Sequence, residues 1–403
     1  QFPSADNQFT ILDLLHRDKV LSAKINRVSD TELTGHRFSS AWATDQRLFF
    51  AIETSHSFSD VLQSPPKKGM KGAQKIALKF NNPNNEPVFV KIGISAVDIE
   101  GAKKNLKGEI GNQTFEQVKK TAQDFWEKQL EKIVVEDSNL DNKTNFYSSM
   151  YHVSIAPNLY QDVDGRYRGM DLKIHESKDF DYYTVFSLWD TYRAAHPLYT
   201  IIDQEKTNDF INTFLAKYDE GGIMPIWDLA ANYTGCMIGY HAVPIIADAY
   251  LKGFRGFDAE KAYKAIREIQ MNNGRVHECG GYVGNRNLNT YMKNGYVPAD
   301  EGPVSNTLEY AYDDWCIAQL AMLADDEANT LVYQKRALNY QHVFNPKSNF
   351  MQPKLSDGSW KTPFDAMETH DQGFIEGNAW NYSLFVPHNP ISLIEMMGGK
   401  EEF

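Results

Sequence analysis

The hydrophobic pattern of the chain changes its period near Thr114, and this change constrains the possible folds more than any other feature. Between about residues 8 and 98, polar turns separate short segments such as "RLFFAIET" and "QKIALKF". Residues 87–97, "PVFVKIGISAV", alternate like a strand with one buried face. This part of the chain is therefore predicted to form an antiparallel β-sandwich.

Helical spacing replaces the alternation after Thr114. Apolar side chains recur at this spacing at Val118, Ala122, Phe125 and Leu130, with Lys and Glu between them, which predicts a long linking helix. Beyond it the sequence contains helix-length segments such as "EKTNDFINTFLAKY" and "DAEKAYKAIREIQ", separated by loops with Gly or Pro. The second part of the chain is therefore predicted to be helical.

A chain of 403 residues is too long for one ordinary core. The two patterns predict an α+β multidomain protein with a partial β-sandwich at 1–110, a linker helix at 111–140 and a helical toroid at 141–403. Residues 237–250 are apolar nearly all round, which predicts a helix buried on both sides, as in a double ring of helices. The helical segments are too few for a closed (α/α)6 toroid, so the toroid is expected to be incomplete.

Charge and hydropathy exclude several classes of partner. The formal net charge is −12, which argues against nucleic acid, because phosphate binding needs a basic surface. No apolar run approaches the ~18–20 residues of a membrane span. The first residues, "QFPS", lack the basic and apolar regions of a signal peptide, which is either already removed or was never there. A neutral ligand such as a sugar fits this charge, and so does a cation.

The three cysteines are odd in number, widely spaced and without a CxxC pair: Cys236, Cys279 and Cys316. A disulfide framework or a zinc site is therefore not predicted, and buried free thiols are the expected state.

The richest stretch of polar chemistry is "ETHDQGFIEGNAW", residues 368–380, with four ionisable side chains within nine residues. Glycoside hydrolysis needs a carboxylic acid that protonates the leaving oxygen and a carboxylate that activates water or attacks. Glu376 lies beside Gly377 and Trp380, and apolar aromatic surroundings would keep its carboxyl protonated. Alternatively, Glu376 caps or hydrogen-bonds the following helix.

Two further stretches combine tryptophan with aspartate. "FSLWDTYRAAHP" places Trp189, Asp190 and Arg193 at the start of a predicted helix, where Asp190 could bind sugar hydroxyls while Trp189 stacks on the sugar. The alternative is an Asp190–Arg193 pair in the first turn of that helix. "IMPIWDLA" adds Trp227 after a Gly-Gly loop.

The segment "LEYAYDDWCI" carries Glu309, Asp313 and Asp314. Adjacent carboxylates point different ways on a helix, so at most one of Asp313 and Asp314 would face a site, and helix-dipole or packing roles are equally expected. His241 falls within the predicted apolar helix and is expected to be a satisfied core histidine rather than a ligand. Residues 162–171, "DVDGRYRGMD", lack the spacing of a calcium-binding EF-hand loop and predict a hairpin.

Long stretches of the chain resemble glycoside hydrolase family ninety-two, which comprises calcium-dependent, inverting exo-α-mannosidases. The resemblance rests on "FYSSMYHVSIAPNLYQDVDGRYRGMD", "YYTVFSLWDTYRAAHPLYTII", "GGIMPIWDLAANYTGCMIGYHAVPIIADAY", "SNTLEYAYDDWCIAQLA" and "DQGFIEGNAWNYSLFVPHN". These motifs occur in order and cover nearly all of residues 87–403. The resemblance implies a β-sandwich with an (α/α)6 toroid, mannose-containing oligosaccharides as substrates, α-1,2 linkages among them, and a periplasmic or secreted bacterial protein.

The resemblance also implies roles for single residues. Glu376 in "FIEGNAW" matches the general acid of the family, and "LWDTYR" matches a sugar-binding element that would include Trp189 and Asp190. Arg193 and Trp227 are further candidates for substrate binding. The segments that carry the general base and the calcium ligands in the family have no counterpart, so the chain is expected to be truncated at both ends and its activity alone is open. The competing hypotheses are another toroid glycosidase or phosphorylase and a non-catalytic glycan-binding protein.

Overall fold

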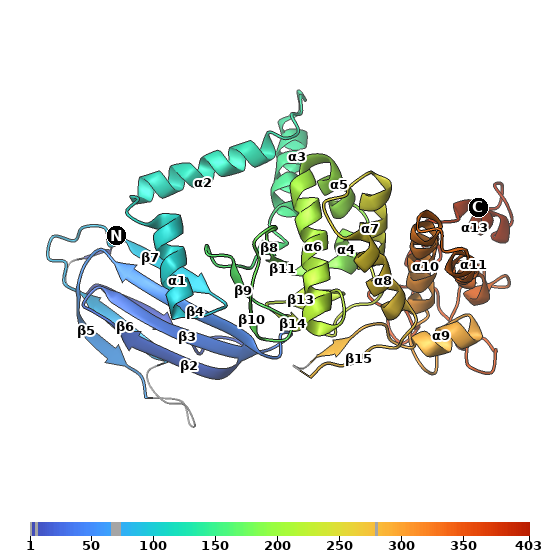
Figure 1. The fold of residues 1–403 in the computed structure, drawn as a ribbon, viewed down its shortest axis with the longest axis horizontal. Coiled ribbons are helices and arrows are strands. Elements are labelled where there is room, and N and C mark those ends of the chain that lie inside the picture. The colour runs from blue at the N-terminus through green and yellow to red at the C-terminus, as the bar shows by residue number, and fades with distance from the viewer. Residues whose placement is uncertain (1, 5–6, 66–73, 279–280) are drawn as a thin grey trace. The chain divides into compact units, whose positions relative to one another are not determined.

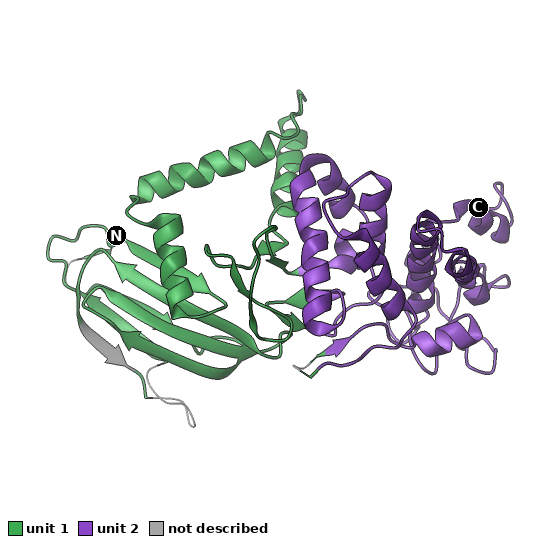
Figure 2. Cartoon of the chain, viewed as in Figure 1, with its two compact units in different colours: residues 1–185, 228–234, 278–281 green, residues 186–227, 235–277, 282–403 purple. Residues whose placement is uncertain are grey.

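The computed structural model of the protein describes residues 2–4, 7–65, 74–278 and 281–403 (Figure 1). The chain divides into two compact units (Figure 2). The first unit comprises residues 1–185, 228–234 and 278–281, and the second comprises residues 186–227, 235–277 and 282–403.

Strands of the first hundred residues form two antiparallel sheets, with the orders β1-β6-β5 and β2-β3-β4-β7. Their bounds are β1 Phe9–Asp13, β2 Lys19–Arg27, β3 Glu32–Ser40, β4 Gln46–Thr54, β5 Phe58–Gln63, β6 Lys75–Phe80 and β7 Val90–Ser95. Side chains from both sheets, among them Ile25, Leu33, Phe50, Ile76 and Leu78, form one buried cluster. This arrangement confirms the predicted antiparallel β-domain at the start of the chain.

Strand β3 was not predicted from the sequence, because "ELTGHRFSS" is largely polar and has Gly35 in its middle. In the sheet, Gly35 pairs with Ile25 and with Phe50. A Cβ atom at Gly35 would lie 2.2 Å from the carbonyl oxygen of Lys24 and 2.5 Å from the Phe50 ring. Glycine therefore breaks the sequence pattern but allows the close packing of this sheet.

A short helical segment, α1 Ile99–Asn105 followed by the π-helix η1 Leu106–Ile110, covers one face of the four-stranded sheet (Figure 1). Ala102 and Leu106 form a small buried cluster with Ala51 of β4. The predicted linking helix is α2 Phe115–Leu130, which begins at a capping box of Thr114 and Gln117, and α3 Leu140–Val153 follows it. The remaining strands of this unit include the predicted hairpin of β9 Arg166–Arg168 and β10 Ile174–Glu176. The other short strands are β8 Asn158–Leu159, β11 Tyr183–Thr184, β13 Trp227–Leu229 (which continues from the second unit) and β14 Asn232–Tyr233.

The second unit is mainly helical. Its helices are α4 Leu188–Thr191, α5 Ala195–Ile202, α6 Gln204–Gly221, α7 Ala242–Leu251, α8 Ala259–Gln270, α9 Leu288–Asn294, α10 Ser305–Leu323, α11 Glu327–Arg336, the 3-10 helix η2 Asn339–Val343, α12 Ala379–Tyr382 and α13 Pro390–Met396. Its short strands are β12 Phe186–Ser187, β15 Arg275–Val276, β16 Tyr282–Val283, β17 Phe344–Asn345 and β18 Phe350–Met351.

Two predicted helices begin or end differently in the structure. The segment at 186–202 forms two helices, α4 and α5, rather than one. The helix predicted at 237–250 begins only at Ala242, because Met237 (φ 64°) and Gly239 (φ 76°) adopt left-handed conformations that a helix cannot contain. His241, predicted to lie inside that helix, is its N-cap residue.

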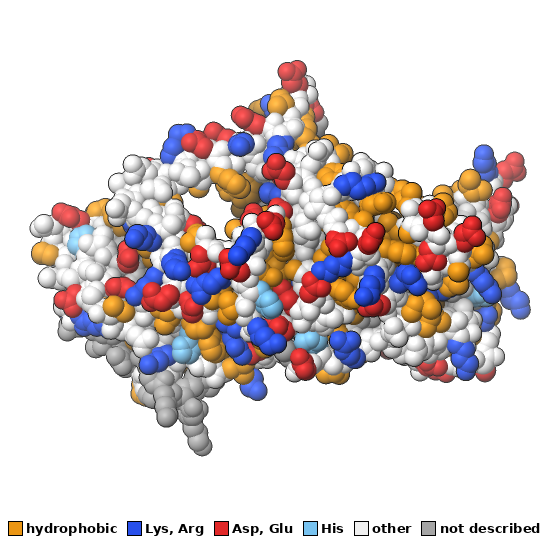
Figure 3. Space-filling view, viewed as in Figure 1, with side chains coloured by type: hydrophobic (Ala, Val, Ile, Leu, Met, Phe, Trp, Pro, Cys, Tyr) orange, Lys and Arg blue, Asp and Glu red, His pale blue; other side chains and the backbone are white. Residues whose placement is uncertain are grey.

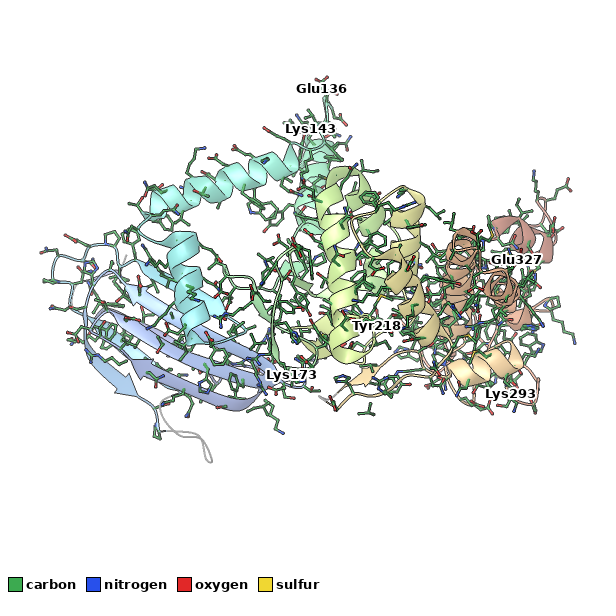
Figure 4. The ribbon with its side chains drawn as sticks, viewed as in Figure 1. Glu136, Lys143, Lys173, Tyr218, Lys293 and Glu327 are labelled. Carbon is green, nitrogen blue, oxygen red and sulfur yellow. The ribbon has the colours of Figure 1, made fainter. Side chains whose placement is uncertain are left out.

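Charges of both signs are interspersed over the face shown in Figure 3. Polar side chains join helices α6 and α8. The hydroxyl of Tyr218 on α6 (Figure 4) donates a hydrogen bond to Glu268 on α8, and Asp219 on α6 forms an ion pair with Lys261 on α8. Among the cysteines, Cys316 on α10 is buried as predicted, Cys236 is partly exposed, and Cys279 lies outside the described residues. No helix in the described part of the chain is both long and apolar enough to cross a membrane.

Candidate functional site

Helix α4 carries two of the predicted binding residues, Trp189 and Asp190, and a third, Arg193, follows its C-cap. Trp189 is half-buried and packs against a core cluster of the second unit, whereas Asp190 is exposed. The hydroxyl of Ser187 donates a hydrogen bond to the Asp190 carboxylate, so the carboxylate is held locally and still faces solvent. An exposed, oriented carboxylate is suited to accept hydrogen bonds from sugar hydroxyls.

Arg193 does not pair with Asp190, which was the alternative interpretation of this segment. Its Nη2 atom lies 3.6 Å from Oε1 of Glu309 on α10. The guanidinium also lies over three aromatic rings, 4.8 Å from the centre of Tyr192, 4.7 Å from the centre of Phe385 and 5.5 Å from that of Trp189. Stacking of this kind holds the planar guanidinium in one orientation.

Glu309 is the buried anchor of this group. Its side chain has no exposed surface, and its Oε1 atom accepts a hydrogen bond of 2.9 Å from the indole Nε1–H of Trp189. The same oxygen is the one nearest to Arg193. A single buried carboxylate therefore fixes both Trp189 and Arg193, two of the residues predicted to bind substrate.

A histidine joins Glu309 to a second buried carboxylate. Nε2 of His241 lies 3.1 Å from Oε2 of Glu309, and its Nδ1 lies 3.0 Å from Oδ1 of Asp313. The other oxygen of Asp313 accepts the backbone N–H of Tyr240 at 2.7 Å. We call Glu309, His241 and Asp313 the buried histidine bridge.

The charges of the bridge decide the state of its histidine. Burial alone would lower the pKa of His241, but the carboxylates of Asp313 and Glu309 outweigh burial and raise this pKa to about 9. The imidazole is therefore an imidazolium at neutral pH: its Nδ1–H donates a hydrogen bond to Asp313, and its charge forms an ion pair with Glu309. His241 is thus a buried histidine with a carboxylate on either side, and it precedes a helix rather than lying within one.

Stability should depend on pH through this group. Because folding raises the pKa of His241 from 6.5 to about 9, the bridge contributes fully below pH 6.5 and loses its contribution as pH rises through 9. We expect the free energy of unfolding to fall by up to about 3 kcal/mol over this range. Denaturant titrations at a series of pH values measure it. The fall should be absent from His241→Gln, and a flat wild-type profile between pH 6.5 and 9 would show that the folded protein does not protonate His241.

Asp314, next to Asp313, points to a different part of the unit. Arg336 of α11 contacts it with two nitrogen–oxygen distances of 2.9 Å, and Gln270 and Tyr291 also donate to it. Burial raises the pKa of Asp314 to about 6 despite these partners. The expectation that the adjacent carboxylates face different ways is thus confirmed, and Asp314 joins α8, α9, α10 and α11.

Glu376 lies in a loop that is fixed by the preceding residue, Ile375. The N–H of Ile375 donates to the Ser305 hydroxyl at the start of α10, and the carbonyl of Ile375 accepts from the Tyr382 hydroxyl at 3.1 Å. Glu376 itself has a left-handed backbone, with φ 48°. A non-glycine residue held in this conformation is often part of a functional site.

The surroundings of Glu376 differ from the predicted ones. The residue is exposed, and the Trp380 ring, predicted to shield it, is 57% exposed and contacts Phe350 at 5.0 Å. Asn378, not Glu376, caps the following helix α12, so the capping role proposed as the alternative is wrong. The general-acid role of Glu376 stays a prediction.

Trp227 is half-buried and lies near α4 through its chain neighbour, because the carbonyl of Ile226 accepts the backbone N–H of Leu188 at 3.4 Å. Tyr382 bonds to the loop of Glu376, at the carbonyl of Ile375. Tyr382 also belongs to the buried cluster against which Trp189 of α4 packs. The chain neighbours Ile375 and Ile226 thus bond to the start of α10 and to the start of α4, and the grouping of all five predicted residues in one site stays a prediction.

The family resemblance implies a bound calcium ion, which would need several oxygen ligands placed close together. Within the described ranges, no group of three or more His, Cys, Asp or Glu residues is placed to hold a metal ion. No step of the proposed reaction is therefore assigned to a metal.

Sequence reasoning did not identify the buried histidine bridge as one unit. Glu309 and Asp313 are four residues apart and thus share one face of α10, so their proximity could be predicted from the sequence. The partner His241 lies far away in the sequence, and its position before α7 depends on the left-handed residues of the preceding turn.

Two family models together match all of the chain except residues 96–100. A family model described as "Glycosyl hydrolase family 92 catalytic domain" matches residues 101–403, and one described as "Glycosyl hydrolase family 92 N-terminal domain" matches residues 1–95.

Similar proteins of known structure come from Bacteroides thetaiotaomicron. The family GH92 alpha-mannosidase BT3965, solved also in complex with mannoimidazole, is 34% identical with a TM-score of 0.89, over 100% of this chain and 55% of that one. The family GH92 inverting mannosidase BT2199 is 28% identical with a TM-score of 0.90, over the same shares. A protein of Arthroderma benhamiae named as an uncharacterized secreted glycosidase is 24% identical over 368 residues, 81% of this chain and 42% of that protein. The chain thus spans about half the length of the relatives that it matches.

Proposed function

The chain belongs to glycosyl hydrolase family 92, and we propose from this membership that the protein is an exo-acting α-mannosidase. The observation that carries the proposal is the similarity over 100% of the chain to a GH92 α-mannosidase, at 34% identity and a TM-score of 0.89. The mannoimidazole complex of that relative supports a mannose-based substrate. We further propose that α-1,2-linked mannose is the preferred substrate. We also propose a secreted or periplasmic location, and the name of the Arthroderma relative supports secretion.

The proposed reaction is hydrolysis with inversion. Glu376 would protonate the glycosidic oxygen as the aglycone leaves, while a second carboxylate activates water on the opposite face of the sugar. We assign that second carboxylate to no residue of this chain. Asp190 and Trp189 would bind the mannose that is cleaved, with Arg193 and Trp227 as further contacts, because the first three share α4 and its C-terminal end and Trp227 follows a residue bonded to α4.

The test is hydrolysis of α-1,2-mannobiose followed by proton NMR. Inversion predicts that β-mannose appears first and then equilibrates with the α-anomer. The assay is run with added calcium and with a chelator, because the family resemblance implies calcium dependence. Release of α-mannose first would contradict inversion, and turnover that requires inorganic phosphate would identify a phosphorylase. Binding of mannose-rich glycans without turnover would identify a binding protein.

Substitution of Asp190 tests the binding element separately. Asp190→Ala should raise KM roughly tenfold or more, the scale of a lost hydrogen bond to a charged group. The melting temperature should hardly change, because Asp190 is exposed and its bond from Ser187 is local. Asp219→Ala, which removes another exposed aspartate of the second unit, is the matched control and should keep the wild-type KM. A variant that loses stability while its KM stays unchanged would assign Asp190 a structural role.

A further inference from the structure

We infer that His241 and Asp313 are positioning residues for sugar binding, because the buried histidine bridge holds Glu309 where it fixes Trp189 and Arg193. The inference rests on the proposed function, since it concerns residues proposed to bind the cleaved mannose. It adds to that function a set of side chains that need not touch the sugar.

The geometry of the bridge leaves Glu309 little freedom. One carboxylate oxygen faces His241 at 3.1 Å, and the other faces the Trp189 indole at 2.9 Å and Arg193 at 3.6 Å. The carboxylate plane is therefore set by groups on both sides. Rotation of Glu309 toward any other partner would break the contact with Trp189.

The imidazole of His241 is fixed in turn. The Tyr192 ring stacks on it with centres 4.1 Å apart and planes 18° apart, and Asp313 holds Nδ1. On the side of the preceding turn, a Cβ at Gly239 would lie 2.1 Å from Nε2, so the glycine leaves the space that the ring needs. Glu309 and Asp313 of α10 and the Tyr192 phenol are the titratable groups that face this ring.

Charge explains why the bridge matters for Glu309. A fully buried carboxylate is strongly disfavoured as an anion unless positive partners and hydrogen bonds compensate for the lost water. Arg193 is 40% exposed at its side chain and lies 3.6 Å away, so it compensates only in part, whereas His241 is 1% exposed and forms an ion pair with Glu309 at 3.1 Å. Without the charge of His241, the Glu309 carboxylate would lose its nearest buried cation, and the position of the side chain would depend on Trp189 and Arg193 alone.

The chain itself offers a matched pair of substitutions for a test. Asp313 and Asp314 are adjacent on α10 and both fully buried, but only Asp313 belongs to the bridge. Asp313→Asn keeps the shape of the side chain and weakens the hold on His241 without touching Trp189 or Arg193. We expect its KM for α-1,2-mannobiose to rise about tenfold while kcat changes little. Asp314→Asn should lower stability and keep the wild-type KM.

The pH profile supplies a readout that a general loss of stability would not produce. The wild-type KM should rise as pH passes about 9, where His241 loses its proton. Asp313→Asn removes one of the two carboxylates that raise this pKa, so the rise should move to lower pH. Asp314→Asn should leave the rise in place. A folded Asp313→Asn protein with wild-type KM and an unmoved profile would overturn the inference.

If Asp313→Asn does not fold, the wild-type enzyme and Trp189→Phe decide the question. Trp189→Phe removes the indole N–H that Glu309 accepts, so it should raise KM at neutral pH and flatten the alkaline rise. An alkaline rise that persists at full size in Trp189→Phe, or a wild-type KM that is constant across pH 9, would overturn the inference. Failure of the proposed function is distinguishable, because the wild-type protein would then not hydrolyse α-1,2-mannobiose at all.

Discussion

Replacement of Glu376 by Gln should lower the turnover of α-1,2-mannobiose by about two to four powers of ten, the usual contribution of general acid catalysis. Glutamine keeps the size of the side chain but cannot deliver a proton to the glycosidic oxygen. The left-handed backbone at this position (φ 48°) and the bonds on either side of Ile375 should hold the loop in place in the variant. Steady-state kinetics with the disaccharide measures the loss.

Leaving-group chemistry separates this role from others. A 4-nitrophenyl α-mannoside needs little protonation of its leaving group, so Glu376→Gln should lose much less activity on it than on the disaccharide. Glu327→Gln at the exposed start of α11 (Figure 4) is the matched control and should keep full activity on both substrates. Equal losses on the two substrates would remove Glu376 from the general-acid role.

The second large effect concerns stability. Arg336→Met should lower the free energy of unfolding by about 3–5 kcal/mol, because it leaves Asp314 buried without its cation. The substitution removes both nitrogen–oxygen pairs that join the two side chains at 2.9 Å. Burial already raises the pKa of Asp314 to about 6, and loss of Arg336 should raise it further. The cost should therefore be smaller at pH 5 than at pH 8, where the variant must bury a charge or take up a proton. Chemical denaturation followed by tryptophan fluorescence measures both values.

A double variant separates the ion pair from the packing around it. Asp314→Leu combined with Arg336→Met removes both charges and keeps apolar bulk, so its stability should return close to that of the wild type. Gln270 and Tyr291 then lose a common acceptor, which sets a modest residual cost. A single Arg336→Met variant that loses less than about 1 kcal/mol would show that Asp314 does not depend on Arg336.

The sequence predicts the architecture through local patterns. Alternation locates β7, and a short apolar segment between polar turns locates β4. Helical spacing locates α6 and α8, because it records the one face that each helix buries. It also locates α2, although of that helix only Gln129 is buried. The pattern does not reveal β3, because the strand has a glycine at its centre. Gly35 has no apolar side chain, and the neighbouring backbone lies too close to it for one. The division at residues 110 and 140 stays a prediction.

Local sequence patterns predict only part of the candidate site. Trp189, Asp190 and Arg193 are neighbours in sequence, so their proximity could be predicted, whereas the partner of Arg193 could not. Glu309 reaches Arg193 from a helix more than a hundred residues further along the chain. Within the "LWDTYR" segment, Asp190 is the carboxylate nearest to Arg193 in sequence, so it was the expected partner. The tertiary structure instead places Glu309 of α10 next to Arg193. The roles of the five predicted site residues stay predictions until they are tested.

Helix α10 carries its charges where dissolved ions cannot reach them. Screening by salt weakens interactions between exposed charges over about 8 Å at physiological ionic strength, but it acts little on pairs that are sealed from solvent. Glu309, Asp313 and Asp314 are all fully buried, and each has its cationic partner inside the unit. The contact between Glu309 and Trp189 should therefore depend little on salt, unlike the exposed ion pairs of the same unit such as Asp219–Lys261.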